Sequence, residues 1–260
     1  MSARPPRLAA LTAILGLGVA LAGCGGSSSS SGAAPEPGAP QGGAGGGAAA
    51  YLSSQTYTSL VVEVDYVQGH APDATALALF EQRLNERLNK PAGISVVLGD
   101  AIASVTSRYS VAQLQALEQQ HRSTAHQPPQ ASLYLLYVDG GSDQDGPNGD
   151  VLGLAYGESS LALFKETIVG AGTAIVTPSE VEGTVLVHEL GHALGLVNLG
   201  TPMVQPHEDA AHRGHDVDDR CVMYWAIETT NIRNLILNRG TLPTQFCAAG
   251  IADLQAAGGK

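Results

Sequence analysis

Two histidines four residues apart, with a glutamate beside the first, are the residues of this sequence best suited to chemistry. His188-Glu189-Leu190-Gly191-His192 places both imidazoles on one face of a helix, one turn apart. Two neutral imidazole nitrogens arranged in this way can bind one Zn²⁺ at about 2.0–2.1 Å each. Glu189 is rotated away from the pair but stays close enough to take a proton from an activated water and return it to a leaving amine. The alternative interpretation is a pair of surface or core histidines that bind no metal.

Two features downstream strengthen the metal interpretation. Gly195 lies three residues after the second histidine, where a glycine lets the chain leave the helix through a left-handed turn. Further on, Cys221-Val222-Met223 places a methionine in a compact apolar segment. Ordinary filling of the core is the simpler role for Met223, and it is compatible with a place beside a metal.

Together, HELGHALGL and the later CVM turn resemble the metzincin zinc peptidases, with the matrixin and archaemetzincin branches nearest. The resemblance implies an α/β (α+β) fold with a mixed twisted sheet, an active-site helix, and a small C-terminal subdomain with a methionine turn and a closing helix. It implies a zinc-dependent endopeptidase that hydrolyses peptide bonds through a zinc-activated water, with Glu189 as general base and Met223 beneath one catalytic Zn²⁺. Residues 139–156 resemble the family's loop and antiparallel edge strand, which pairs with an extended substrate. Residues 244–257 resemble its closing helix.

The third zinc ligand departs from the family pattern. The family places His or Asp three residues after the glycine, and here that residue is Asn198, whose neutral amide is a poor zinc ligand. In the archaemetzincin pattern, His-Cys is followed by four residues and then Cys-x-Met. Here His215-Asp216 is followed by four residues and then Cys221-Val222-Met223. We therefore expect a loop inserted over residues 198–214, with His215 as the third ligand.

Two other histidines compete with His215. His207 and His212 lie in the same segment and are rivals for this site, or for a second ion with Glu208 or Asp209. A solvated histidine-rich loop is the remaining interpretation.

Other candidate sites have weaker patterns. Asp143, Asp145, Asn148 and Asp150 alternate with glycine like a Ca²⁺ loop, but they lack the full EF-hand spacing and its final glutamate, so a solvated turn is favoured. Outside the cytoplasm, the pair Cys221 and Cys247 is expected to form a disulfide, ahead of a zinc thiolate or a nucleophile.

The N-terminus resembles a bacterial lipoprotein signal. Arg4 and Arg7 precede an apolar run over residues 8–21, which is too short for a membrane-spanning helix. Leu21-Ala22-Gly23-Cys24 then resembles the lipoprotein box, which implies a signal peptide at residues 1–23 and lipid attachment to Cys24. An ordinary signal peptide with an incidental Cys24 is the alternative. We expect a protein anchored by lipid in a bacterial cell envelope, facing the periplasm or the exterior.

The remaining chain divides into a tether and one domain. Residues 24–50 are rich in Gly, Ser, Ala and Pro and predict a flexible tether. Residues 51–260 predict a metallopeptidase domain, with an upper subdomain at 51–195 and a lower one at 196–260. A capping box of Ser179 with Glu182 is expected to begin the active-site helix. Apolar periodicity predicts strands at 60–67, 94–98, 131–138 and 151–156, helices at 71–88, 111–121 and 178–194, and a strand or ribbon at 161–168.

Composition limits the partners. The 260 residues are 44% hydrophobic and 14% charged, with a net charge of −11. This composition argues against a disordered chain and against binding to phosphate backbones. Gly-x-Ser-x-Gly, phosphate-loop and dinucleotide motifs are absent from the sequence. We therefore expect a peptide or protein substrate, with neither nucleic acid nor nucleotide as partner. The alternative function, motivated by Asn198, is a non-catalytic zinc-binding or scaffolding envelope lipoprotein.

Overall fold

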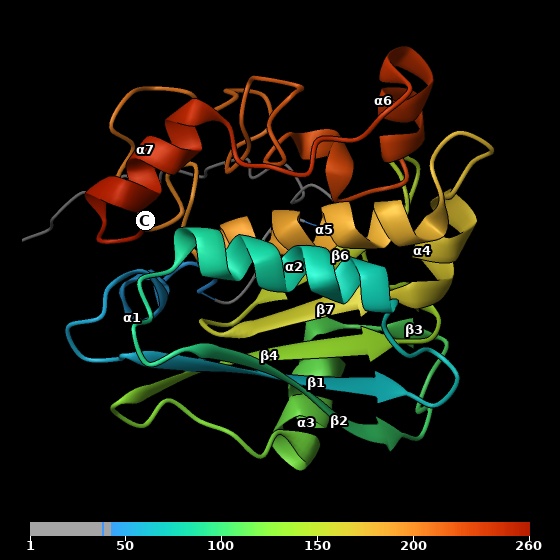
Figure 1. Cartoon of the computed structure of the whole chain (residues 1–260). Coiled ribbons are helices and arrows are strands. Elements are labelled where there is room, and N and C mark those ends of the chain that lie inside the picture. Colours follow the sequence, from blue (N-terminus) through green and yellow to red (C-terminus); the bar gives the residue numbers. More distant parts are fainter. Residues whose placement is uncertain (1–37, 39–42) are drawn as a thin grey trace, which may run out of the picture. The chain divides into compact units, whose positions relative to one another are not determined.

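The computed structural model describes Gly38 and residues 43–260 (Figure 1). The expected signal peptide, most of the expected tether and Cys24, the expected site of lipid attachment, lie outside the described residues. Within the described part, no helix combines the length and the apolar character that a membrane crossing requires.

A five-stranded mixed sheet forms the centre of the fold. Its order is β2-β1-β4-β7-β6, and β6 at one edge is the strand that runs antiparallel to its neighbour. The mixed α/β class predicted from the sequence is therefore confirmed. The strands are β1 (Ser59–Val67), β2 (Ile94–Ile102), β4 (Gln130–Val138), β6 (Gly153–Tyr156) and β7 (Ser160–Phe164).

Helices cover both faces of this sheet because its central strands are apolar on both faces (Figure 1). In β4, Leu133, Leu135 and Tyr137 pack into a core shared with α2 (Ala74–Arg87) and α5 (Pro178–Ala193). The alternate residues Tyr134, Leu136 and Val138 pack into a second core with Leu114 and Leu117 of α3 (Val111–His121). The helix with the histidine pair thus lies on one face of the sheet.

Helix α5 has its N-cap two residues before Ser179, the expected cap. Thr177, with Glu180 as its partner, forms the capping box of α5, and Pro178 occupies the first turn. The expected box of Ser179 with Glu182 is wrong because these side chains bind another helix. The Ser179 hydroxyl donates to Asp73, the N-cap of α2, at 2.6 Å, and Glu182 accepts from the Asp73 backbone N–H at 2.7 Å.

Three other segments differ from the sequence expectations. The strand expected at 161–168 ends at Phe164, and its second half belongs to helix α4 (Lys165–Ala171). Strand β2 continues beyond residue 98 to Ile102. The third segment is the end of the expected tether, where Ala48 is buried at the start of α1 (Ala48–Leu52). The short elements that the sequence analysis did not predict are β3 (Arg108–Tyr109), β5 (Gly141–Ser142), η1 (Trp225–Ile227) and α6 (Ile232–Arg239).

A buried lysine holds the N-terminal helix in place. The Lys90 ammonium group donates hydrogen bonds of 2.6–2.8 Å to the backbone carbonyls of Ala50, Ser53 and Tyr57. These bonds connect α1 and the chain after it to the loop between α2 and β2. At the other end of the chain, α7 (Ala248–Ala256) falls within the expected closing helix.

Candidate metal centre

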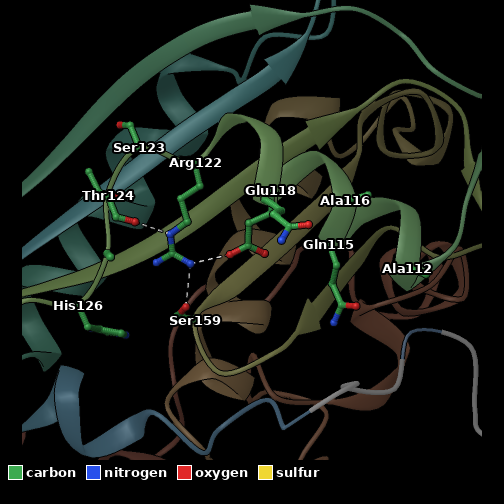
Figure 2. A pocket seen from close by; sticks show the side chains of 11 residues that line it. Ala112, Gln115, Ala116, Glu118, Arg122, Ser123, Thr124, His126 and Ser159 are labelled. Atoms are coloured by element: carbon green, nitrogen blue, oxygen red, sulfur yellow. Dashed lines mark hydrogen bonds and ion pairs between the residues drawn. The ribbon is translucent and has the colours of Figure 1, made fainter. Parts of the chain in front are cut away.

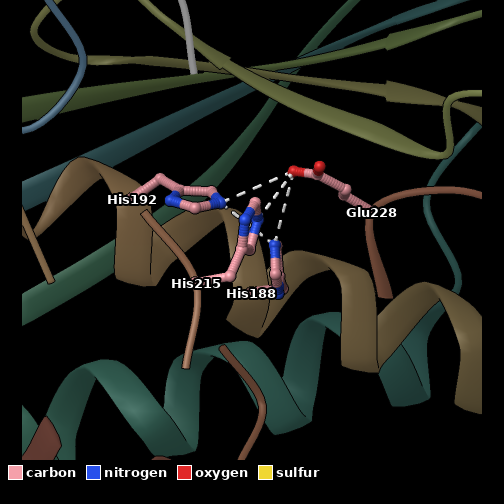
Figure 3. Close-up of side chains that lie close together, drawn as sticks. All are labelled: His188, His192, His215 and Glu228. Carbon is pink, nitrogen blue, oxygen red and sulfur yellow. Dashed lines mark hydrogen bonds and ion pairs between the residues drawn. The ribbon is translucent and has the colours of Figure 1, made fainter. Parts of the chain in front are cut away.

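Three histidines and one glutamate meet above helix α5 (Figure 3). The Nε2 atoms of His188 and His192 lie 3.0 Å apart, and His215 Nε2 lies 3.0 Å from Glu228 Oε2. The same Glu228 oxygen is 3.7 Å from the Nε2 atoms of His188 and His192. All four side chains are buried. The structure thus brings His215 beside the helical pair, and it adds a carboxylate that the sequence analysis did not predict.

These separations suit a tetrahedral ion. A metal with four ligands at about 2.0–2.1 Å holds the ligand atoms roughly 3.3–3.4 Å apart. The measured separations of 3.0 and 3.7 Å lie on either side of that value. Imidazole nitrogens with one carboxylate oxygen are also a donor set that Zn²⁺ accepts. The residues present therefore fit Zn²⁺.

Hydrogen bonds and backbone pairing orient these ligands. His188 Nδ1 lies 2.6 Å from the carbonyl oxygen of Val222, which can only accept, so Nδ1 carries the proton and Nε2 presents its lone pair to the centre. The residue after His215 is fixed as well, because the Asp216 backbone N–H donates to Met223 O at 2.8 Å. Glu228 follows η1, and its carbonyl accepts from the backbone N–H of Leu152 at 2.8 Å.

Burial sets the charge states of these groups. Burial lowers the pKa of His188, and it lowers the pKa of His192 to about 3, so both rings are neutral near pH 7. Neutral imidazole is the form that binds metal. Burial alone would raise the pKa of Glu228, but the neighbouring His215 and hydrogen bonds with the imidazoles keep it well below its ordinary value. The centre thus contains neutral imidazoles at His188 and His192 and an ionised carboxylate at Glu228.

Glu189 lies beside the cluster in an apolar setting. Both of its carboxylate oxygens are buried without a close hydrogen-bond partner among the described residues. Burial raises the pKa of Glu189 well above the ordinary value, and the charge of Glu228 raises it further. The Ala155 backbone N–H acts in the opposite direction and lowers the pKa, by less than these two effects raise it. Gly153 of β6 packs directly on the Glu189 side chain. A carboxyl group held in this way has the raised proton affinity that a general base requires.

Met223 packs on the helix between the two histidines. A Cβ built on Gly191 would overlap the Met223 sulfur, and it would lie 3.0 Å from Phe246. Glycine is therefore favoured at residue 191, the fourth position of the motif, because the Met223 side chain packs against the helix there. The helix ends at Ala193, and the chain then turns at Gly195, which has the expected left-handed conformation with a φ of +70°.

The two rival histidines lie elsewhere. His207 lies between two carboxylates, with Nδ1 2.6 Å from Asp216 and Nε2 2.7 Å from Asp253. His207, Asp216 and Cys247 form a second group of side chains close enough together to hold a metal. His212 instead stacks on Trp225, with ring centroids 4.2 Å apart.

The residue at the family's usual ligand position also lies outside the cluster. The Asn198 amide donates to Glu208 at 3.4 Å. Residues 198–214 form an irregular segment between Asn198 and the buried His215. The expected insertion and the ligand role of His215 both stay proposals.

The remaining sequence candidates have other neighbours. Cys221 and Cys247 are free thiols whose sulfur atoms lie 2.7 Å apart, so the expected disulfide stays a prediction. In the acidic loop, Asp145 accepts the backbone N–H of Val151 at 2.9 Å. Gly146 and Gly149 close a turn in the same loop.

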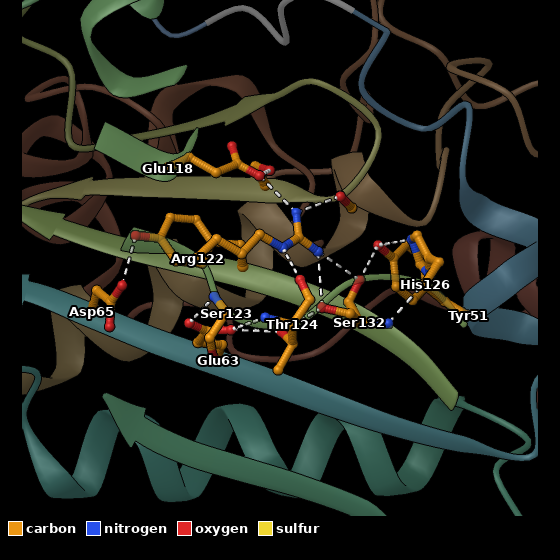
Figure 4. A network of polar contacts seen from close by, with 12 residues as sticks. Tyr51, Glu63, Asp65, Glu118, Arg122, Ser123, Thr124, His126 and Ser132 are labelled. Atoms are coloured by element: carbon orange, nitrogen blue, oxygen red, sulfur yellow. Dashed lines mark hydrogen bonds and ion pairs between the residues drawn. The ribbon is translucent and has the colours of Figure 1, made fainter. Parts of the chain in front are cut away.

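A separate pocket of about 780 Å³ adjoins α3, the helix that packs on the other face of the sheet (Figure 2). In the wall of this pocket, the Arg122 guanidinium binds Glu118 and Ser159 (Figure 2). Glu63 accepts three hydrogen bonds from Ser123 and Thr124 (Figure 4). Burial alone would raise the pKa of Glu63, but these hydrogen bonds bring it below the ordinary value. Because the charged groups already satisfy one another, we interpret the network as structural.

Comparison with known proteins gives only distant matches. No protein-family model and no curated protein matches the chain. The solved archaemetzincin from Methanopyrus kandleri is 18% identical, with a TM-score of 0.49 over 77% of this chain and 96% of that one. Metalloproteinase-II from Bacteroides fragilis is 15% identical, with a TM-score of 0.45 over 79% of this chain and 54% of that one. A zinc-dependent peptidase from Methanocorpusculum labreanum is 14% identical, with a TM-score of 0.45 over 74% of this chain and 99% of that one.

Proposed function

We propose that the protein is a zinc-dependent endopeptidase. The observation that carries this proposal is the buried group of three imidazole nitrogens beside the carboxylate of Glu189. His188, His192 and His215 would hold the ion, with His207 and His212 in other environments. Zn²⁺ held there would acidify a water and polarise a carbonyl group.

The chain's own residues supply the proton transfer. Glu189 accepts a proton from the attacking water and then donates it to the departing amide nitrogen. Burial raises the pKa of Glu189, so its carboxylate holds an accepted proton more tightly than an exposed carboxylate would. Gly153 holds the side chain against the helix, and Met223 supports the two-histidine turn from its other side.

The substrate class follows from the edge strand. Strand β6 is the edge of the sheet, and Gly153 at its start contacts Glu189. An extended peptide that adds to this edge would be aligned by backbone hydrogen bonds and would bring a scissile bond to the centre. We therefore favour a peptide or protein substrate over a nucleic acid or nucleotide.

The site of action belongs to the same proposal. The lipoprotein box at Cys24 supports a lipid anchor in a bacterial envelope, facing the periplasm or the exterior. Cys24→Ser should release the protein into the soluble fraction and remove the lipid mass from the purified chain. A Cys24→Ser protein that fractionates with membranes as wild type does would contradict the anchor.

Glu189→Gln tests the peptidase chemistry. The variant should retain one zinc per chain and lose cleavage of a casein-type substrate, because the amide cannot accept the proton. Glu81→Gln, on the exposed face of α2, is the matched control and should cleave at the wild-type rate. Cleavage by Glu189→Gln at the wild-type rate would contradict this mechanism.

Glu228 supports a second candidate function. A carboxylate within 3.7 Å of each histidine nitrogen gives four protein donors, as in structural zinc sites. A non-catalytic zinc-binding or scaffolding lipoprotein would then bind zinc tightly and cleave no peptide. Zinc content combined with the cleavage assay separates the two functions.

A further inference from the structure

Glu228 lies between the buried histidines and an open pocket. Its carboxylate contacts all three imidazoles (Figure 3), and Glu228 also lines a pocket of about 400 Å³. Other side chains that line this pocket include His212 and Trp225. The histidines themselves are at most 2% exposed. A water or peptide that enters from this pocket therefore meets Glu228 before it reaches the metal centre.

A short backbone pairing holds Glu228 in this position. Leu152 donates its backbone N–H to Glu228 O at 2.8 Å, and Val151 pairs antiparallel with Thr229. Thr230 donates to Asp150 O at 2.8 Å. The segment 228–230 thus runs beside the residues that lead into edge strand β6, the strand to which we assign substrate alignment.

Gly38 contacts the side chain of Glu228. A Cβ built on Gly38 would lie 3.0 Å from both Cγ and Cδ of Glu228. Gly38 also donates its backbone N–H to Gln144 at 3.3 Å. The Glu228 side chain therefore lies against Gly38 as well as against the imidazoles.

We propose that Glu228 is the fourth protein ligand of the metal, and that it closes the site until it swings into the adjoining pocket. This inference rests on the metal centre of the proposed function, not on its peptidase chemistry. With the carboxylate in place, the corner that a water needs is filled. With the carboxylate in the pocket, three histidines and Glu189 form the open site.

Metal binding tests the ligand directly. The purified chain is freed of metal and titrated with Zn²⁺ and with Co²⁺, whose visible spectrum reports coordination. Wild type should give a four-coordinate Co²⁺ spectrum that added azide or acetohydroxamate leaves unchanged. Glu228→Gln should weaken Zn²⁺ binding by at least about tenfold, the lower end of what loss of even an outer-shell partner costs. Its Co²⁺ spectrum should shift when either small ligand is added.

Two controls keep the result interpretable. Glu81→Gln should match wild type in affinity and spectrum, and circular dichroism of metal-free Glu228→Gln should show whether the fold is retained. Glu228→Asp, which keeps the charge on a shorter side chain, should also admit azide. If Glu228→Gln keeps wild-type affinity and a spectrum insensitive to azide, Glu228 is not a ligand.

Cleavage at saturating Zn²⁺ tests the closure. Glu228→Gln should raise kcat/KM for a peptide severalfold, because no carboxylate at residue 228 has to leave the metal before the substrate binds. A fall in kcat/KM would overturn the closing role. If neither protein cleaves peptide but the spectra change as expected, the proposed peptidase fails and the fourth ligand stands.

Discussion

Gly153 and Glu189 are in direct contact across the interface between edge strand β6 and helix α5. A Cβ on Gly153 would lie 2.7 Å from Glu189 Oε1 and 2.8 Å from its Cγ. Real Cβ atoms do not approach other atoms so closely. A side chain at residue 153 is therefore incompatible with the present position of Glu189, the general-base candidate. The absence of a side chain at residue 153 is what allows Glu189 to lie beside the metal centre.

Gly153→Ala should therefore displace Glu189 while leaving the histidines in place. We expect cleavage to fall by roughly tenfold or more, since small displacements of catalytic groups cost about that much or more, and Zn²⁺ content to stay at one per chain. Gly170→Ala in α4 is the control, because a Cβ there meets nothing within 4 Å. Equal kcat values for the Gly153 and Gly170 variants would show that the contact does not position Glu189.

Met223 should contribute to stability through its packing on Gly191. Met223→Ala leaves a cavity beneath the histidine turn, and we expect it to lower the free energy of unfolding by about 2–4 kcal/mol. Met223→Leu keeps the volume and should cost less than about 1.5 kcal/mol. Urea unfolding of the metal-free proteins measures both values. An alanine variant as stable as the leucine variant would contradict close packing at this contact.

The parts of the site found from sequence are those encoded locally. The spacing of His188, Glu189 and His192 predicts a shared helix face, and α5 provides it. His215 needed the spacing to Met223, because an irregular loop separates it from the helix. Glu228 was missed because its position depends on the pairing of Thr229 with Val151, two residues far apart in sequence. The one local indication was a single acidic residue directly after the apolar Trp225-Ala226-Ile227.

The fold shows the same division between local and tertiary signals. Helix α3 has the bounds that its periodicity predicts, because its apolar residues and cap lie within one segment. The start of α5 was misplaced because Ser179, a good capping residue in isolation, donates instead to Asp73 of α2. The strand predicted at 161–168 was half wrong, since its apolar run continues into α4 after Phe164. Local signals were therefore sufficient for α3, whereas a partner on another helix decided where α5 begins.

Alanine substitution of the three loop histidines should separate their roles. His215→Ala should reduce bound Zn²⁺ well below one per chain, because its Nε2 faces the centre. His212→Ala should keep its Zn²⁺, since that ring stacks on Trp225. His207→Ala should keep its Zn²⁺ too, because both ring nitrogens face aspartates. Atomic absorption on dialysed protein gives the counts, and zinc loss in His207→Ala alone would move the third ligand to that residue.

Cys221 and Cys247 should form a disulfide under oxidising conditions. Their sulfur atoms lie 2.7 Å apart, and the residues are 26 positions apart in the chain. Closing a loop of that length should raise the free energy of unfolding by roughly 3–4 kcal/mol. Intact mass should fall by two hydrogens on oxidation, and urea unfolding of the oxidised and reduced forms measures the gain. Cys247→Ser should remove the difference, and an oxidised protein that keeps both thiols would contradict the pairing.

His207 should make stability depend on pH above the ordinary pKa of histidine. Burial alone would lower the pKa of His207, but hydrogen bonds and charge from Asp253 and Asp216 outweigh it and raise the pKa. The folded protein therefore binds this proton more tightly than the unfolded chain, whose histidine has a pKa of about 6.5. The stabilisation is complete below that value and is lost as the pH rises through the higher folded-state pKa.

Urea unfolding of the metal-free protein at several pH values from mildly acidic to alkaline measures this loss. His207→Gln should be less stable than wild type at the acidic end, and the gap between the two should shrink as the pH rises. His70→Gln, whose ring pairs with the exposed Glu166, is the control and should follow the wild-type profile. If the gap between wild type and His207→Gln stays constant over this range, the residue is not held as an imidazolium between the two aspartates.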